Sequence, residues 1–93
     1  MNNKIDLSEL LDQTRALDDA SILNETSDQF LELVRSIDGS EIRINGNAQG
    51  LVHFARRVLE VAAKDFDGAH EHFDELSGFD HCDVPLIVRK KQN

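Results

Sequence analysis

The chain has 93 residues, with ten Lys and Arg against eighteen Asp and Glu, and a net charge of −8. This excess of acid argues against binding nucleic acid through phosphates, and no apolar run approaches the roughly 18–20 residues that span a bilayer. The single Cys excludes an intramolecular disulfide, and the first residues lack the apolar stretch of a signal peptide. We therefore expect one cytoplasmic domain over residues 1–93, with neither nucleic acid nor a membrane as partner.

The first 38 residues predict two helices. The first is expected over residues 7–18, after a capping box formed by Asp6 and Glu9. The second is expected over residues 27–38, with Gly39 as its C-terminal cap. Each helix carries an apolar stripe, made of Leu7, Leu10, Leu11 and Leu17 in the first and of Phe30, Leu33, Val34 and Ile37 in the second. The stripes either cover the sheet predicted below or, for these N-terminal helices, form a homodimer contact.

Residues 41–63 predict a strand followed by a long helix. Ile42 and Ile44 alternate with polar residues, as in a strand with one buried face. Asn47 is the expected N-cap of the helix, and Gly46 supplies the tight turn before it. Apolar residues then recur at helical spacing, at Leu51, Phe54, Ala55, Val58, Val61 and Ala62. Such a helix is built to be buried against a sheet.

Two further strands are expected after this helix. Residues 70–75 place Phe73 on one face of the first strand and His70 and His72 on the other. Residues 84–90 form the second strand, and the short loop between them predicts an antiparallel hairpin. The predicted fold class is α+β, with two N-terminal helices in residues 1–38 followed by a βαββ unit in residues 39–93 that contains a three-stranded sheet.

Histidine and cysteine residues near the C-terminal end are candidates for chemistry. His70 and His72 share one strand face, and His81 or Cys82 could complete a zinc site with them, but no standard ligand spacing is present. The neighbours His81, Cys82 and Asp83 have the residue types of a thiol triad, yet adjacent residues cannot all converge on one thiolate. We therefore expect no enzyme and no cofactor. The metal candidates belong to an alternative hypothesis, a small metal-binding or regulatory domain.

A series of short motifs runs from the predicted strand to the end of the chain. A Gly-Asn pair ends the strand, a Gly-Leu pair opens the helix, a His-x-His strand follows, and an apolar strand closes the chain. The residues are Gly46, Asn47, Gly50, Leu51, His70, His72 and Asp74. In this series residues 41–90 resemble immunity protein family thirty-two of the bacterial polymorphic toxin systems. The resemblance implies a protein that binds and neutralises a toxin made by the same bacterium, without chemistry of its own.

Acidic residues dominate one part of the chain. Residues 65–83 carry seven acids and no Lys or Arg. Acidic surfaces attract basic partners and help to select them, although the same charges also keep a small domain soluble. An immunity protein of this kind would bind a basic toxin and occlude its active or substrate-binding surface. The candidate contacts are Asp74, Glu75, Asp80 and Asp83, with Phe79 as an apolar anchor in the acidic loop.

Overall fold

A computed structural model describes residues 6–22 and 29–92 of the protein. Two helices and five strands are present in these residues. In chain order they are α1 (Leu7–Ile22), β1 (Leu31–Arg35), β2 (Ile42–Gly46), α2 (Ala48–Ala63), β3 (His70–Phe73), β4 (His81–Cys82) and β5 (Leu86–Arg89). The fold is therefore mixed α+β, as predicted. Neither helix is long and apolar enough to cross a membrane.

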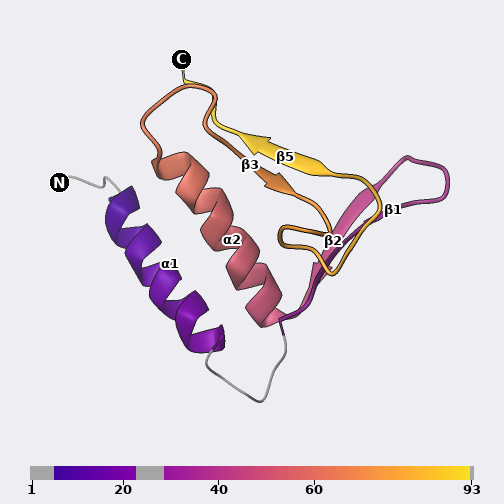
Figure 1. Ribbon diagram of the computed structural model, residues 1–93, viewed down its shortest axis with the longest axis horizontal. Coiled ribbons are helices and arrows are strands. Elements are labelled where there is room, and N and C mark those ends of the chain that lie inside the picture. The colour runs from indigo at the N-terminus through magenta and orange to yellow at the C-terminus, as the bar shows by residue number, and fades with distance from the viewer. Residues whose placement is uncertain (1–5, 23–28, 93) are drawn as a thin grey trace.

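The strands form two small sheets beside α2. One sheet has the order β2-β1-β4, and the other pairs β3 with β5. Figure 1 shows α2 between α1 on one side and the strands on the other. The β1–β2 pair projects away from the helices as a long hairpin (Figure 1). The two helices differ in position. Helix α2 contacts four of the strands, whereas α1 packs on α2.

The predicted second helix over residues 27–38 is wrong, because this segment contains strand β1. Its residues 27 and 28 lie outside the described part of the chain. Leu31 and Leu33 are buried, and the residue after each is only partly buried, which is the two-residue period of a strand. β1 pairs antiparallel with β2, Leu33 opposite Ile44. Gly39, the predicted helix cap, has φ 74° and lies in the turn of this hairpin.

Helix α1 begins where the sequence predicts. Its cap is Asp6, whose Oδ1 accepts hydrogen bonds from the backbone N–H of Ser8 at 3.0 Å and of Glu9 at 3.4 Å. The helix continues past residue 18 to Ile22. Over residues 7–19 of this helix Leu11 and Asp18 are buried, so the contact with α2 is partly apolar and partly charged. The other leucines of the predicted stripe, Leu7, Leu10 and Leu17, are exposed.

Helix α2 begins at a cap that also holds β1. The side-chain Oδ1 of Asn47 accepts a hydrogen bond from Gly50 N at 2.8 Å, as predicted for an N-cap, and one from Phe30 N at 3.0 Å. The backbone N–H of Asn47 donates to Phe30 O at 3.1 Å. A Cβ on Gly50 would overlap the Phe30 carbonyl, with its carbonyl carbon only 2.6 Å away. Only glycine lets the first turn of α2 lie this close to β1.

The predicted hairpin of residues 70–75 and 84–90 is confirmed, because β3 and β5 pair antiparallel with His72 opposite Ile87. The predicted three-stranded sheet is wrong in its membership. β2 does not join β3 and β5, since its one partner among the described strands is β1. The third strand of the β2 sheet is β4, two residues within the loop between β3 and β5, which pairs parallel with β1. A two-residue strand has no periodicity that a sequence could reveal.

The core lies between α2 and the two sheets. It is built from Leu31, Leu33, Phe73 and Phe79, with Phe54 of α2 packed against them. The ring of Phe54 lies 4.9 Å from that of Phe73 and 6.1 Å from that of Phe79, measured between centroids. These contacts pack both sheets against one helix, α2.

Candidate functional site

Among the described side chains, two large apolar ones are almost fully exposed, and each lies in a turn. Ile37 is in the turn between β1 and β2, and Leu76, with 98% of its surface exposed, is in the turn after β3. A single exposed apolar side chain is common on any protein. These two differ from an ordinary exposed side chain because each lies in a turn that is ordered by an aspartate. Each aspartate accepts several hydrogen bonds.

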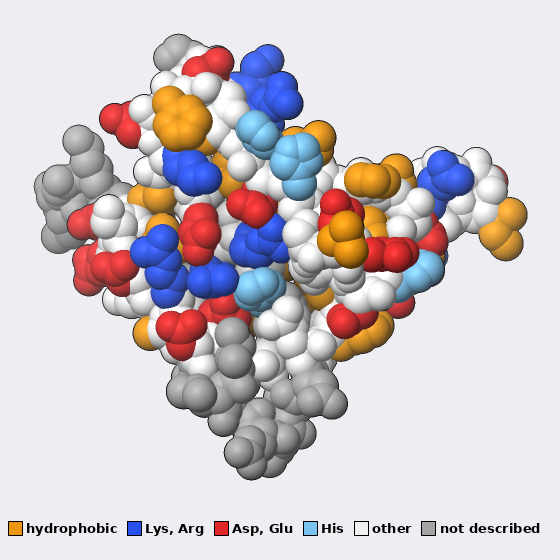
Figure 2. Space-filling view, in the orientation of Figure 1, with side chains coloured by type: hydrophobic (Ala, Val, Ile, Leu, Met, Phe, Trp, Pro, Cys, Tyr) orange, Lys and Arg blue, Asp and Glu red, His pale blue; other side chains and the backbone are white. Residues whose placement is uncertain are grey.

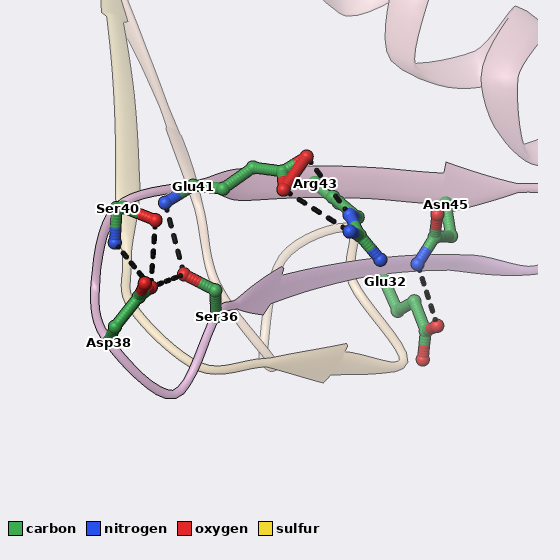
Figure 3. A network of polar contacts seen from close by, with 7 residues as sticks. All are labelled: Glu32, Ser36, Asp38, Ser40, Glu41, Arg43 and Asn45. Atoms are coloured by element: carbon green, nitrogen blue, oxygen red, sulfur yellow. Dashed lines mark hydrogen bonds and ion pairs between the residues drawn. The ribbon is translucent and has the colours of Figure 1, made fainter.

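Asp38 orders the turn that carries Ile37 (Figure 3). Its Oδ1 accepts hydrogen bonds from the Ser36 hydroxyl at 2.8 Å, and from the backbone N–H and the hydroxyl of Ser40 at 3.0 and 2.7 Å. These donors, with the Ser40 N–H first, lower the pKa of Asp38 from 3.8 to about 2. Three hydrogen bonds therefore stabilise the turn, and Asp38 carries its negative charge at physiological pH.

Asp74 orders the turn that carries Leu76. Its Oδ1 accepts hydrogen bonds from Leu76 N at 2.9 Å and from the Ser77 hydroxyl at 3.0 Å. The Ser77 hydroxyl is the main cause that lowers the pKa of Asp74 below its ordinary value. From α2, the Nη1 atom of Arg57 donates to Ser77 O at 2.7 Å. The turn is fixed at both ends, and Leu76 points out of it.

Asp80 and Asp83, two of the predicted contacts, bind the backbone of β1. Asp80 Oδ2 accepts from Leu31 N at 2.9 Å, and Asp83 Oδ2 accepts from Arg35 N at 2.8 Å. The Arg35 N–H is also the first cause that lowers the pKa of Asp83. The backbone N–H groups of both aspartates donate to β1 in return, to Leu31 O at 2.8 Å and to Leu33 O at 3.0 Å. The two carboxylates thus extend the short β1–β4 ladder at its two ends.

The other predicted contacts divide between surface and core. Glu75 is exposed beside Leu76, whereas Asp74 is partly buried in its turn. Phe79 is only 2% exposed and packs on Phe73, with 5.8 Å between the ring centroids, so it is not available as an anchor. The exposed apolar residue of this loop is Leu76, and not Phe79 as predicted. The signal for this was the Asp74 to Ser77 spacing, a turn motif that places the residues between them at the tip.

The predicted metal candidates fall on different sheets. His70 and His72 neighbour each other on β3, with ring centroids 5.0 Å apart, and His70 Nδ1 donates to Gly68 O at 2.9 Å. His81 and Cys82 form β4 instead. His81 Nε2 lies 2.7 Å from Asp83 Oδ1, the Cys82 thiol donates to Val84 O, and burial raises the pKa of that thiol. Over residues 6–22 and 29–92 no three His, Cys, Asp or Glu side chains are arranged to hold a metal ion.

A buried carboxylate joins the two helices. Asp18 of α1 is fully buried, and its Oδ2 lies 2.7 Å from Arg56 Nε and 2.9 Å from His53 Nδ1. Arg56 lies 3.5 Å and Arg15 3.6 Å from Glu60, which extends the network to the surface. Figure 2 shows basic and acidic side chains side by side over the two helices. The arginines of this region are therefore engaged in holding α1 on α2.

The fold and its two ordered turns define a small mixed α+β protein. The family model described as Immunity protein 32 matches residues 41–91, more than half of the chain. The chain belongs to the Immunity protein 32 family. Membership makes it an immunity protein and implies that it binds a cognate toxin. The match begins one residue before β2 and includes the turn that carries Leu76, while α1 and β1 lie before it. Neither a curated protein nor a solved structure matches the chain.

Proposed function

We propose that the protein neutralises its cognate toxin by binding it and occluding its active or substrate-binding surface, without catalysis of its own. The family supports the partner. The observation that carries the binding mode is the turn of residues 74–77, in which an exposed Leu76 stands on an ordered support. An apolar side chain displayed in this way enters a pocket of a partner at little entropic cost, because the turn is already ordered.

Charge supports a basic toxin as the partner. The chain carries a net charge of −8, and Glu75 lies beside Leu76 with its side chain in solvent. An acidic surface accelerates encounter with a basic protein and disfavours acidic ones. An acidic turn inserted into the basic cleft of a toxin also competes directly with the toxin's own substrate, which is how binding alone would neutralise it.

The contacts of the candidate reactive groups support a proposal without catalysis. Cys82 donates its thiol to a backbone carbonyl, and burial keeps it protonated by raising its pKa. The carboxylates of Asp80 and Asp83 are committed to the backbone of β1. A nucleophile must be ionised or paired with a base to react, and this thiol is neither.

Co-expression tests the proposal. The toxic C-terminal domain encoded by the adjacent gene is expressed with this protein, and growth is measured. Wild-type protein is expected to restore growth, and Leu76→Asp is expected to lose most of that protection while it keeps its fold, because Leu76 is outside the core. Leu7→Asp is the matched control, since an acid in the first turn of α1 is favourable. Wild-type protein that neither restores growth nor binds the domain contradicts the proposed function.

A further inference from the structure

Strand β2 lies at an open edge of its sheet. Its partner is β1, and the hydrogen bonds from Ser36 N to Glu41 O at 2.9 Å and from Asn47 N to Phe30 O at 3.1 Å fix the alternation of the ladder. By this alternation the backbone groups of Arg43 and Asn45 face β1, and those of Ile42 and Ile44 face outward. Within residues 6–22 and 29–92, no backbone group pairs with Ile42 or Ile44 on that edge.

In the described part of the chain, the far edge of β1 and the edges of β3 and β5 are less open than that of β2. The far edge of β1 is closed by β4 and by the carboxylates of Asp80 and Asp83. On β3 the carbonyl of His72 accepts hydrogen bonds from Arg57 at 3.0 Å and from the Ser77 hydroxyl at 3.1 Å. β5 follows a proline and ends in a basic run, both of which oppose strand pairing.

None of these protections is present along β2. The strand has five residues without proline, and Arg43, its one charged residue, is bound to Glu41 with Nε and Oε1 3.1 Å apart. Ile42 is 57% exposed, and Ile44 is half-buried beside it on the same face. A strand edge with unpaired backbone groups and apolar side chains is a template for another strand.

The hairpin holds this edge in a fixed shape before any partner arrives. Figure 3 shows the Asp38 network closing one end of the hairpin, and the Glu32–Asn45 hydrogen bond of 3.1 Å joining β1 to β2 further along. Glu41 N also donates to the Ser36 hydroxyl at 3.0 Å. A preformed edge loses little conformational entropy when a partner strand is added, which favours binding.

We propose that an extended segment of the toxin adds to the free edge of β2 as a further strand. Its backbone would bond to Ile42 and Ile44, and its alternate side chains would be apolar where they meet these isoleucines and polar where they meet Arg43 and Asn45. The charge of the chain selects the toxin over a second copy, because two copies of net charge −8 repel each other whereas a basic segment is attracted. This inference rests on the proposed function.

Amide hydrogen exchange tests the inference on the whole chain without any substitution. The probe is the C-terminal domain encoded by the adjacent gene. The amides of Ile42 and Ile44 are expected to exchange quickly in the free protein and at least about tenfold more slowly in the complex. Unchanged rates in a complex that forms overturn the strand addition and leave the proposed function intact. A chain that forms no complex overturns both.

A pair of substitutions at one position separates backbone from side-chain recognition. Ile42→Pro removes an outward N–H that bonds to nothing in the described structure, and Ile42→Thr keeps this N–H in a residue that favours strands. The proline variant is expected to bind the toxin domain at least about tenfold more weakly, and the threonine variant within about threefold of wild type. Equal affinities of the two variants overturn the inference.

A fold control and a competing occupant complete the test. Circular dichroism and slow exchange of the Arg43 and Asn45 amides check that the proline variant keeps its hairpin. If the variant loses the hairpin, amide exchange in the wild-type complex is the test of strand addition. Ile42 and Ile44 exchange in the free protein is then followed as its concentration rises. Slowing with concentration would assign the edge to a second copy and overturn the proposal. Rates independent of concentration support the toxin as occupant.

Discussion

The guanidinium of Arg57 lies over the ring of Phe73, with its Cζ 4.2 Å from the ring centroid. The same side chain forms an ion pair with Glu71 and donates to the carbonyl oxygens of Ser77 and His72, at 2.7 and 3.0 Å. One side chain of α2 therefore binds strand β3 and the turn that displays Leu76. The orientation of this turn depends on α2, and the contact also fills the space over Gly78, where any Cβ would meet the guanidinium.

Replacement of Arg57 by Met is expected to destabilise the protein by about 2–4 kcal/mol, because it removes a cation–π contact and the donor to the Ser77 carbonyl and the Glu71 carboxylate. The His72 carbonyl loses one of its two donors and keeps the Ser77 hydroxyl. Urea denaturation followed by circular dichroism measures the loss. Arg89→Gln is the matched control, since Arg89 is exposed on β5, and its effect is expected within about 0.5 kcal/mol. A similar effect of both variants would show that Arg57 contributes only general charge.

Replacement of Asp18 by Asn is expected to loosen α1 from α2. The carboxylate is fully buried and lies against Arg56 and His53, so its loss removes the buried partner of Arg56 and leaves only the more distant Glu60. The expected cost is about 2–4 kcal/mol, toward the lower end because Arg56 is partly exposed. Asp12→Asn removes a surface pair with Arg15, so we expect about 0.5 kcal/mol or less. Faster amide exchange throughout α1 in Asp18→Asn, and not in Asp12→Asn, would confirm the role of Asp18.

The sequence carries enough local information for some elements and too little for others. Asp6 and Asn47 could be predicted as caps because a cap bonds within its own helix turn. Residues 30–37 satisfy a helical stripe, through Phe30, Leu33 and Val34, as well as the alternation of a strand. Pairing with β2 and β4 makes this segment a strand and not a helix. The residues of β1 themselves do not show which segments they pair with.

The candidate site divides in the same way. Within the acidic segment the sequence predicted toxin contacts in residues 74–83, and Glu75 is exposed there. Whether Leu76 or Phe79 would be displayed depends on the direction of the turn, and that direction is fixed by Asp74 and by a donor from α2. Contacts between distant elements also decided that Asp80 and Asp83 bind β1, which no local spacing indicated.

Glu75 and Asp80 are therefore expected to respond differently to charge reversal. Glu75→Lys leaves the melting temperature unchanged and slows association with a basic toxin about threefold to tenfold at low salt, because it acts on encounter. Asp80→Lys lowers the melting temperature, since it removes the acceptor of the Leu31 N–H. Thermal denaturation together with association kinetics separates the two effects. Equal melting temperatures would contradict the structural role of Asp80.

The pKa of Asp38 gives a pH test of the ordered turn. Because the folded-state pKa lies at about 2, below the ordinary 3.8, this carboxylate stabilises the hairpin above pH 4, and the contribution is lost as the pH falls toward 2. A carboxyl titration by NMR is expected to give a midpoint of about 2. In Ser40→Ala the hydroxyl donor is lost while the backbone N–H remains, so the midpoint rises part of the way toward 3.8. An unshifted midpoint in this variant would contradict the hydrogen bond.

Gly50 sets helix propensity against packing. Ala in place of Gly within a helix normally stabilises by about 1 kcal/mol. At this position the added Cβ overlaps the Phe30 carbonyl, and backbone cannot move aside as a flexible side chain does. Gly50→Ala is therefore expected to destabilise by about 3 kcal/mol or more, and to disturb the contact between the cap of α2 and β1. Ala55→Gly, at an exposed position of the same helix, measures propensity alone and is expected to cost about 1 kcal/mol. Denaturation of both variants decides, because a neutral or stabilising Gly50→Ala would mean that β1 does not lie against the first turn of α2.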